Sequence, residues 1–179
     1  MNEGKHSTVL DPEKAALILT QAIPSVFAEM IFMDAVPVAS SWGVAESENP
    51  ADTSAAVRIA IDMLMPLSCR LELSMSSELA DSIADTLYGG TDAESFALGA
   101  TPAAIAADQN RADSTLELLN VFAGSFLSAY FGAGTPFKLE LPFFLFGASE
   151  VSDPSIARVE FNVDGLTAIV TLRSIRYRY

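Results

Sequence analysis

The sequence contains very few of the residues that most often carry metal or nucleophilic chemistry. Among its 179 residues there is one histidine, His6, and one cysteine, Cys69. A single cysteine excludes an intrachain disulfide and a thiolate metal cluster within one chain. Because we expect the N-terminus that carries His6 to be mobile, His-based zinc binding and Ser-His catalysis are also disfavoured. Cys69 lies in a strand-like run between Leu67 and Leu71, which predicts a buried, inert thiol.

Basic residues and long apolar runs are also scarce. The 10 Lys and Arg residues stand against 23 Asp and Glu residues, which gives a formal net charge of −13. This balance argues against nucleic acid and anionic lipid as partners, because both require a basic surface. No uninterrupted apolar run approaches the roughly eighteen residues that span a bilayer, so we expect a soluble chain with no membrane partner.

The N-terminus lacks the features of a secretory signal. Residues 1–8 contain neither a basic start nor an apolar central segment, which makes the cytoplasm the expected location. The length of the chain suits one compact unit with a single core. We therefore predict one domain over residues 1–179, with a flexible N-terminus over residues 1–10.

The most informative stretch is residues 113–130, which has the apolar period of an α-helix. At roughly 100° per residue, one broad side of this helix is apolar. That side contains Leu116, Leu119, Phe122, Ala123, Phe126 and Tyr130. The opposite side, which we call the polar stripe, contains Asp113, Glu117, Asn120, Gly124 and Ser128. The pattern predicts a helix with one face against a core and the polar stripe on the other.

A solvated helix face is the simplest interpretation of the polar stripe, because Glu-x-x-Asn is a common spacing. Two of its residues are nevertheless poor choices for a helix. Asn120 is a mediocre helix former, and Gly124 costs about 1 kcal/mol relative to Ala in a helix interior. A glycine also lets another backbone approach closely. These features favour a docking face for a partner.

The spacing that continues beyond this helix is more specific. Glu117 follows Asp113 by four residues, Asn120 follows Glu117 by three, and Pro142 follows Asn120 by 22. This arrangement resembles the signature of the CheC/CheX family of CheY-phosphate phosphatases. Residues 119–126 look like the active-site helix of that family. The resemblance covers the chain best from about residue 75 to Pro142.

The resemblance implies a fold and a chemistry. The fold is α/β (α+β) and CheC/CheX-like, with two long helices packed on a mainly antiparallel sheet. In the implied activity, Asn120 aligns the water that hydrolyses the aspartyl phosphate of a CheY-like receiver domain. Glu117 engages the active-site lysine of that receiver. The receiver would supply both the phosphorylated aspartate and Mg²⁺, so the resemblance implies no cofactor or metal held by this chain.

The other motif residues are given supporting roles. Asp113 is expected to cap or orient the helix beside the partner, Gly124 to give clearance, and Ser128 to contact the partner. Pro142 is expected to shape a strand edge. The resemblance also implies a homodimer.

A weaker copy of the motif occurs in the first half of the chain. Ser25 and Glu29 repeat the spacing, but Phe32 stands where the amide would be required. We interpret this as a pseudo-twofold internal repeat whose first site has been lost, which resembles single-site CheX more than two-site CheC. The helix of this copy begins after Asp11, and Pro24 predicts a kink or a division into two segments. Its mostly buried residues are expected to be Leu17, Ala22, Val26, Phe27, Met30 and Ile31.

The remaining segments alternate between strands, loops and helices. Strands are predicted at residues 36–44, 56–63, 66–75, 156–163 and 166–173. The last two are joined by Asp164-Gly165, a two-residue hairpin signal. A capped helix is predicted over residues 75–90, and a helix or a pair of helices is predicted from Pro102 into Asp113. Surface loops are predicted at residues 46–54 and 91–101.

Two other functions remain open from the sequence. The same helix face could dock a receiver domain or a flagellar-switch protein without catalysis. Alternatively, the aromatic segment 143–146 could belong to a small-ligand sensor, although such residues are more often core or dimer contacts. The order of the strands, the identity of the receiver and the rate of turnover do not follow from the sequence.

Overall fold

The fold is taken from a computed structural model that describes residues 10–42, 56–88, 109–146 and 155–175. Several predicted features lie outside these ranges. They are His6 with residues 1–9 of the flexible N-terminus, the loops at 46–54 and 91–101, and the start of a helix at Pro102.

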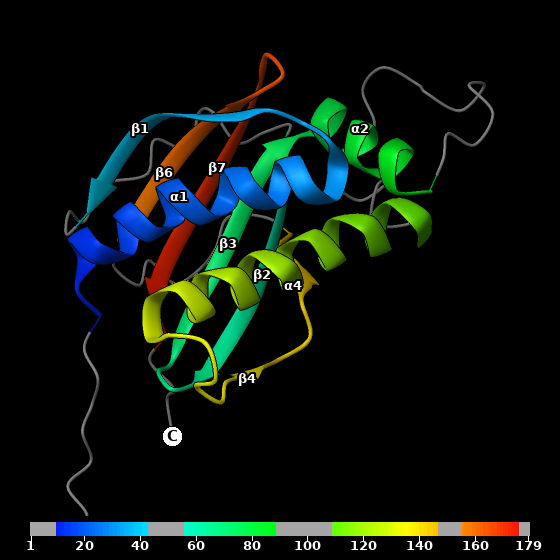
Figure 1. Cartoon of the computed structure of the whole chain (residues 1–179). Helices are drawn as coiled ribbons and strands as arrows, with labels where there is room; N and C mark the ends of the chain where they lie inside the picture. The colour runs from blue at the N-terminus through cyan, green and yellow to red at the C-terminus, as the bar shows by residue number, and fades with distance from the viewer. Residues whose placement is uncertain (1–9, 43–55, 89–108, 147–154, 176–179) are drawn as a thin grey trace, which may run out of the picture.

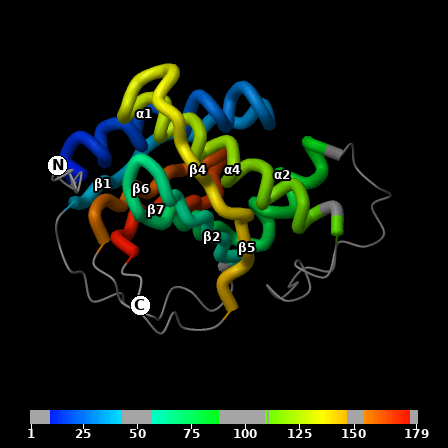
Figure 2. The backbone as a smooth tube through the Cα atoms, turned by 90° about the horizontal axis from the view of Figure 1, so that it is seen from below, coloured from blue at the N-terminus to red at the C-terminus, as the bar shows by residue number. Residues whose placement is uncertain are grey.

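An antiparallel sheet forms one layer of the described structure, and the helices cover one of its faces (Figures 1 and 2). The strands are β1 (Ala35–Trp42), β2 (Ala56–Met65), β3 (Cys69–Ser76), β4 (Lys138–Leu139), β5 (Phe143–Phe144), β6 (Ser155–Val163) and β7 (Leu166–Ser174). Their order is β1-β6-β7-β3-β2-β4, and β5 also pairs with β2. All the described pairs are antiparallel, which confirms the predicted character of the sheet.

Local turn chemistry determines the hairpin between β6 and β7. Asp164 has φ 49° and Gly165 has φ 90°. Two consecutive residues with positive φ are typical of the tight turn whose twist matches that of the flanking strands. Asn162 Oδ1 also accepts a hydrogen bond from the Gly165 N–H at 2.9 Å. The hairpin therefore forms where the sequence predicts it.

Helix α1 (Pro12–Ile31) begins where its capping residue predicts. The Asp11 carboxylate accepts hydrogen bonds from the N–H groups of Glu13 and Lys14 at 3.0 and 3.2 Å. The prediction that Pro24 could divide this helix into two segments is wrong, because α1 is one helix with Pro24 inside it. Apolar residues on both sides of Pro24 pack into the same core, and this burial keeps the two halves together.

Helix α1 is long and apolar enough to pass a composition test for a membrane span. Its apolar character has another explanation, because eight of its residues are buried in the core shared with the sheet. The predicted burial of Leu17 is wrong, since this side chain is 56% exposed. Position 17 falls on the side of the helix opposite the buried residues. A prediction based only on the apolar character of leucine does not take that position into account.

Two further helices complete the helical layer. Helix α2 (Ser77–Tyr88) starts after Ser76, whose hydroxyl accepts a hydrogen bond from the Leu79 N–H at 3.2 Å. Helix α4 (Gln109–Phe131) packs mainly against α1 and α2 (Figure 1). The described layer therefore contains three helices, which corrects the predicted two long ones. The third helix belongs to the layer because α2 buries Leu79, Ala80 and Ile83 in it.

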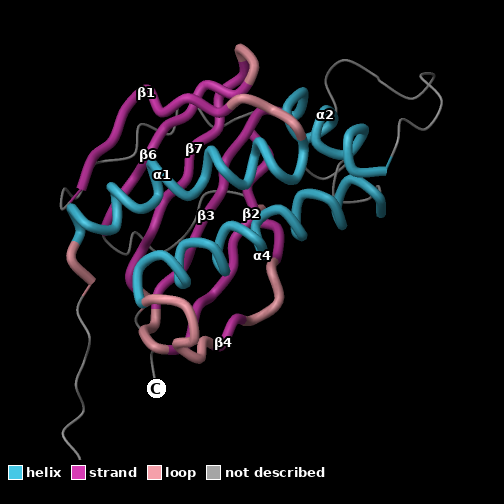
Figure 3. The backbone as a smooth tube through the Cα atoms, in the orientation of Figure 1, coloured by secondary structure: helices cyan, strands magenta, loops and turns pink. Residues whose placement is uncertain are grey.

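The chain leaves α4 at a glycine and returns to the sheet at its β2 edge (Figure 3). Gly132 has φ 94°, and its N–H donates to the Ser128 carbonyl at 3.0 Å, which ends the helix. Along β2, Met63 pairs with Leu139 in β4, and Ile59 pairs with Phe144 in β5. The segment from β4 to β5 is thus a short, interrupted edge.

Candidate functional site

All five residues of the polar stripe lie on the single continuous helix α4. Asp113, Glu117 and Ser128 are exposed, and Asn120 and Gly124 are partly exposed. At 1.5 Å per residue, the stripe extends about 22 Å along the helix. Glu117 and Asn120 are three residues apart, so their side chains are neighbours on the helix surface. The structure therefore brings the predicted residues together on one face.

The opposite side of α4 is fixed in the core. Leu119, Phe122, Ala123 and Phe126 are completely or almost completely buried, as predicted. The ring of Phe122 meets that of Phe27 of α1 edge to face, with 5.2 Å between the ring centres. Because Phe122 is two residues from Asn120, this contact fixes where the stripe lies along α1 and how α4 is rotated about its own axis.

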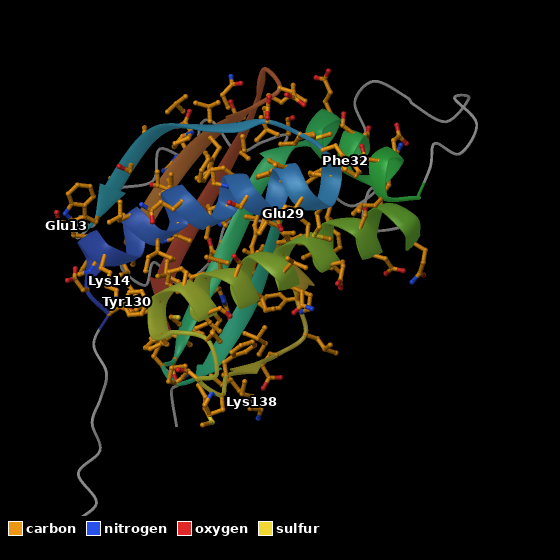
Figure 4. All side chains as sticks on the ribbon, viewed as in Figure 1. Glu13, Lys14, Glu29, Phe32, Tyr130 and Lys138 are labelled. Atoms are coloured by element: carbon orange, nitrogen blue, oxygen red, sulfur yellow. The ribbon has the colours of Figure 1, made fainter. Side chains whose placement is uncertain are left out.

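Polar contacts hold the C-terminal end of α4 on the start of α1 (Figure 4). The Tyr130 hydroxyl accepts a hydrogen bond from the Asp11 N–H at 2.9 Å. Lys14 Nζ donates to the Tyr130 carbonyl at 3.1 Å and lies 4.2 Å from the centre of its ring. A lysine at this point also stabilises the negative end of the helix dipole. We call this set of contacts the Tyr130 anchor.

The N-terminal end of α4 is held on α2. Arg111 Nη1 lies 3.3 Å from Asp81 Oδ1, and both side chains are largely shielded from solvent. The attraction between the two charges is stronger in such a shielded pair than in an exposed one, because solvent screens it less. The polar stripe is therefore carried by a helix that is fixed at its centre and at both ends.

The polar groups of the stripe have almost no partners within the described residues. Asn120 and Glu117 make no hydrogen bond or ion pair there, and Asp113 has only a long 3.5 Å contact from Gln109 Nε2. Three arginines of the sheet pair with carboxylates away from the stripe. Arg58 and Arg173 approach Glu72, and Arg70 pairs with Asp62. Within the described part of the chain, the stripe therefore presents an amide and a carboxylate side by side, neither of which has a partner there.

Gly124 has no packing reason to be a glycine within the described structure. A Cβ atom added to it would meet nothing within 4 Å, and its φ is not positive. Glycine in a helix interior is unfavourable relative to alanine. The open space beside Gly124 is thus available to a group from outside the chain.

The weaker copy of the motif on α1 differs from the stripe in its backbone. Glu29 is exposed within the helix, but the helix ends at Ile31. Phe32 follows with φ 54° and ψ 32°, in the left-handed region. The position that corresponds to Asn120 therefore lies at the end of a helix and not inside one. The predicted pseudo-twofold repeat stays a prediction.

Comparisons with known proteins place this geometry in a known fold. No protein-family model matches the sequence, and no curated protein sequence matches it. Among solved structures, a chemotaxis protein CheX from Desulfovibrio desulfuricans superposes with a TM-score of 0.66 over 90% of this chain and 99% of its own, at 13% identity. CheX in the CheX–CheY–BeF3–Mg²⁺ complex from Borrelia burgdorferi gives 0.60 over 94% and 100%, at 16% identity.

A third match is FliY from Thermotoga maritima, with a TM-score of 0.57 over 93% of this chain and 92% of that chain, at 18% identity. These identities are low, and the likeness is one of fold. The chain has the CheX/CheC-like fold. The resemblance seen in the sequence is thereby confirmed at the level of the fold, and the roles of single residues remain predictions.

Within this CheX/CheC-like fold, Pro142 lies apart from the stripe, in the edge segment between β4 and β5. The Glu140 N–H donates to the Asp62 carbonyl at 2.9 Å, and the Leu145 N–H donates to the Arg58 carbonyl at 2.8 Å. Pro142 stands between these two contacts, where it has no N–H to offer to β2. This position agrees with a structural role at a strand edge.

Cys69 is fully buried in β3, as predicted. Burial, and to a lesser extent the charge of Asp62, raises the pKa of its thiol well above the ordinary value. The thiol is therefore protonated at neutral pH and a poor nucleophile. No group of three or more His, Cys, Asp or Glu side chains in the described ranges could hold a metal ion.

The contacts that hold α4 were not found from the sequence. Lys14 and Tyr130 are far apart along the chain, and so are Asp81 and Arg111. A lysine and an arginine that lie in the first turns of two helices are ordinary surface residues when read locally. No local pattern could have identified these pairs, because the contacts exist only once the helices are packed together.

Proposed function

We propose that this protein is a phosphatase that accelerates hydrolysis of the aspartyl phosphate of a CheY-like receiver domain. The observation that carries the proposal is the pair Glu117 and Asn120, which lie three residues apart on a fixed helix and have no partner within the described residues. The CheX/CheC-like fold supports it, since one protein of similar structure forms a complex with CheY.

The chemistry requires little more than positioning. An acyl phosphate is already reactive, so hydrolysis needs a water held in line with the bond that breaks. The Asn120 amide can accept a hydrogen bond from this water and donate one, and it does not titrate. A neutral amide also avoids the repulsion that a carboxylate would experience close to a phosphoryl group.

Glu117 serves docking in this proposal. One turn from Asn120, its carboxylate pairs with the active-site lysine of the receiver and so orients α4. The receiver supplies the phosphorylated aspartate and Mg²⁺. Asp113 and Ser128 contact the receiver at the two ends of the stripe.

The proposed setting is two-component or chemotaxis signalling in the cytoplasm, with the chain acting as a homodimer. Among the described residues, the outer edge of β1 pairs with no other strand, which supports self-association. Val36 and Val38 are each 58% exposed there, and Trp42 is 46% exposed. An exposed strand edge with large apolar side chains is a common pairing surface.

The proposal is tested with a ³²P-labelled phosphorylated receiver domain from the same organism. Catalytic amounts of the protein should shorten the lifetime of the phosphoryl group in a concentration-dependent way. Saturable binding without faster decay would instead support the second function, a non-catalytic module that docks a receiver or a flagellar-switch protein.

Glu117→Gln should weaken receiver binding more than it changes the fold. The substitution keeps the size of the side chain and removes its charge, so we expect a roughly tenfold rise in Kd. The salt dependence of binding should also become shallower. Glu140→Gln is the matched control, because Glu140 is an exposed carboxylate in the edge segment and not on α4. Equal effects of the two substitutions would contradict the assignment.

Gly124→Ala should move stability and binding in opposite directions. The added methyl group meets nothing in the described structure, so we expect the free energy of unfolding to rise by about 0.5–1 kcal/mol. Receiver binding should weaken, because the methyl group occupies the clearance proposed for the partner backbone. Urea unfolding and a binding titration measure the two effects. A variant with improved stability and unchanged affinity would show that the glycine does not serve docking.

A further inference from the structure

Phe32, at the C-terminal end of α1, combines two unfavourable features. Its side chain is 85% exposed, and its backbone is left-handed, with φ 54°. This conformation allows the Phe32 N–H, together with the Met33 N–H at 3.3 Å, to bond to the Phe27 carbonyl and close the helix. Bulky residues are rare in this region, and such outliers cluster at functional positions.

The backbone alone does not explain the choice of phenylalanine. The same task at the end of α4 is performed by Gly132, with φ 94°. Glycine or asparagine would close α1 with less strain. The core does not explain the residue either, because the ring lies mostly in solvent. The reason for an aromatic side chain at position 32 must therefore be sought outside the fold of this chain.

Phe32 follows α1, which packs beside the helix that carries the polar stripe (Figure 1). Helices α1 and α4 run antiparallel, because the start of α1 contacts the end of α4 through Asp11 and Tyr130. The ring contact of Phe27 with Phe122 fixes their relative height. Phe32 is five residues beyond Phe27, and Glu117 is five residues before Phe122, a shift of about 7.5 Å along each helix. Phe32, labelled at the end of α1 in Figure 4, is therefore level with Glu117 along the helix axes by this count of residues.

We propose that Phe32 is an apolar anchor that packs against the receiver domain beside its phosphorylated aspartate while Asn120 reaches the phosphoryl group. This inference rests on the proposed function and adds a residue outside its motif. Interfaces commonly combine an aromatic anchor with neighbouring polar contacts. Because the exposed ring lies at the height of Glu117 beside α4, a receiver docked on the polar stripe is the occupant that can reach it. In the weaker copy of the motif, Phe32 would thus provide an apolar contact at the position where the motif requires an amide.

Steady-state dephosphorylation and receiver binding by Phe32→Asn and Phe32→Ala test the proposal. Asparagine suits the left-handed conformation, so Phe32→Asn should fold at least as stably as the wild type. Both variants should raise KM and Kd about tenfold, with kcat unchanged. Leu17→Ala is the matched control, since it removes an exposed apolar side chain from the distant end of the same helix; its KM should stay within about twofold of the wild type.

The outcomes separate the two proposals. Unchanged KM and Kd in both Phe32 variants, with normal wild-type activity, would overturn the role of Phe32 and leave the phosphatase proposal intact. Failure of the wild-type protein to bind a phosphorylated receiver would overturn both proposals. A change in sedimentation of the Phe32 variants without a change in receiver affinity would identify a second copy of this chain as the occupant and would also overturn the proposed contact.

Discussion

Asn120→Ala is expected to remove the acceleration of receiver dephosphorylation, with kcat reduced by roughly 100-fold or more. The amide is proposed to hold the attacking water, and a methyl group can neither donate nor accept a hydrogen bond. Asn120 is partly exposed and bonds to no other described residue, so its removal leaves no buried group unsatisfied. Alanine is also the better helix former, and the free energy of unfolding should be unchanged or slightly higher.

The same variant should still bind the phosphorylated receiver, because Glu117 and the rest of the face remain. Receiver affinity, kcat and urea unfolding should be measured on one preparation. Asn120→Asp is a useful companion, since it keeps the shape of the side chain but adds a charge that is repelled by the phosphoryl group. Normal kcat in Asn120→Ala would contradict the assignment of this residue. Loss of kcat together with loss of binding would reassign Asn120 from catalysis to docking.

Phe122→Ala is expected to lower the free energy of unfolding by about 3–5 kcal/mol. The ring is fully buried and packs edge to face on Phe27, so its removal leaves a cavity between α1 and α4. A loss of this size is a large part of the total stability of an ordinary domain. Urea denaturation followed by circular dichroism measures it.

Leu17→Ala is the matched control for this loss, because it removes a large apolar side chain from a largely exposed position. Its effect on the free energy of unfolding should stay within about 0.5 kcal/mol. A loss below about 1 kcal/mol in Phe122→Ala would contradict the described packing of α4, since a buried phenylalanine that is removed so easily does not hold a helix in place.

Local patterns in the sequence were sufficient for several elements. The apolar period of residues 113–130 identified both faces of α4, because a helix repeats its environment every 3.6 residues. The hairpin at Asp164 and Gly165 followed from a turn that needs two residues with positive φ. The start of α1 followed from Asp11, whose carboxylate bonds to nearby N–H groups. In each case the determining contact lies within a few residues along the chain.

Features that depend on distant contacts did not follow from the sequence. The continuity of α1 through Pro24 and the exposure of Leu17 depend on where the core lies relative to that helix. The strand order places β6 and β7 between β1 and β3, which no local signal specifies. That α2 belongs to the helical layer also follows only from its packing against α4.

The candidate site also has features that the sequence predicted and features that only the packing of the helices determines. The composition of the polar stripe was read from spacing, and its exposure agrees with that reading. The Tyr130 anchor, the pair of Arg111 with Asp81, and the height of Phe32 beside Glu117 depend on how α1, α2 and α4 pack. These contacts turn a helical pattern into a fixed surface.

The central claim is that the outer face of α4 meets the phosphorylated active site of a receiver domain. It is tested most directly by NMR of the ¹⁵N-labelled protein titrated with a receiver held in its activated state by beryllofluoride and Mg²⁺. The largest shift changes are predicted at the side-chain amide of Asn120 and at the backbone amides from Glu117 to Gly124. Saturable binding with changes confined to β1 or to the segment from β4 to β5, and with α4 unaffected, would contradict it.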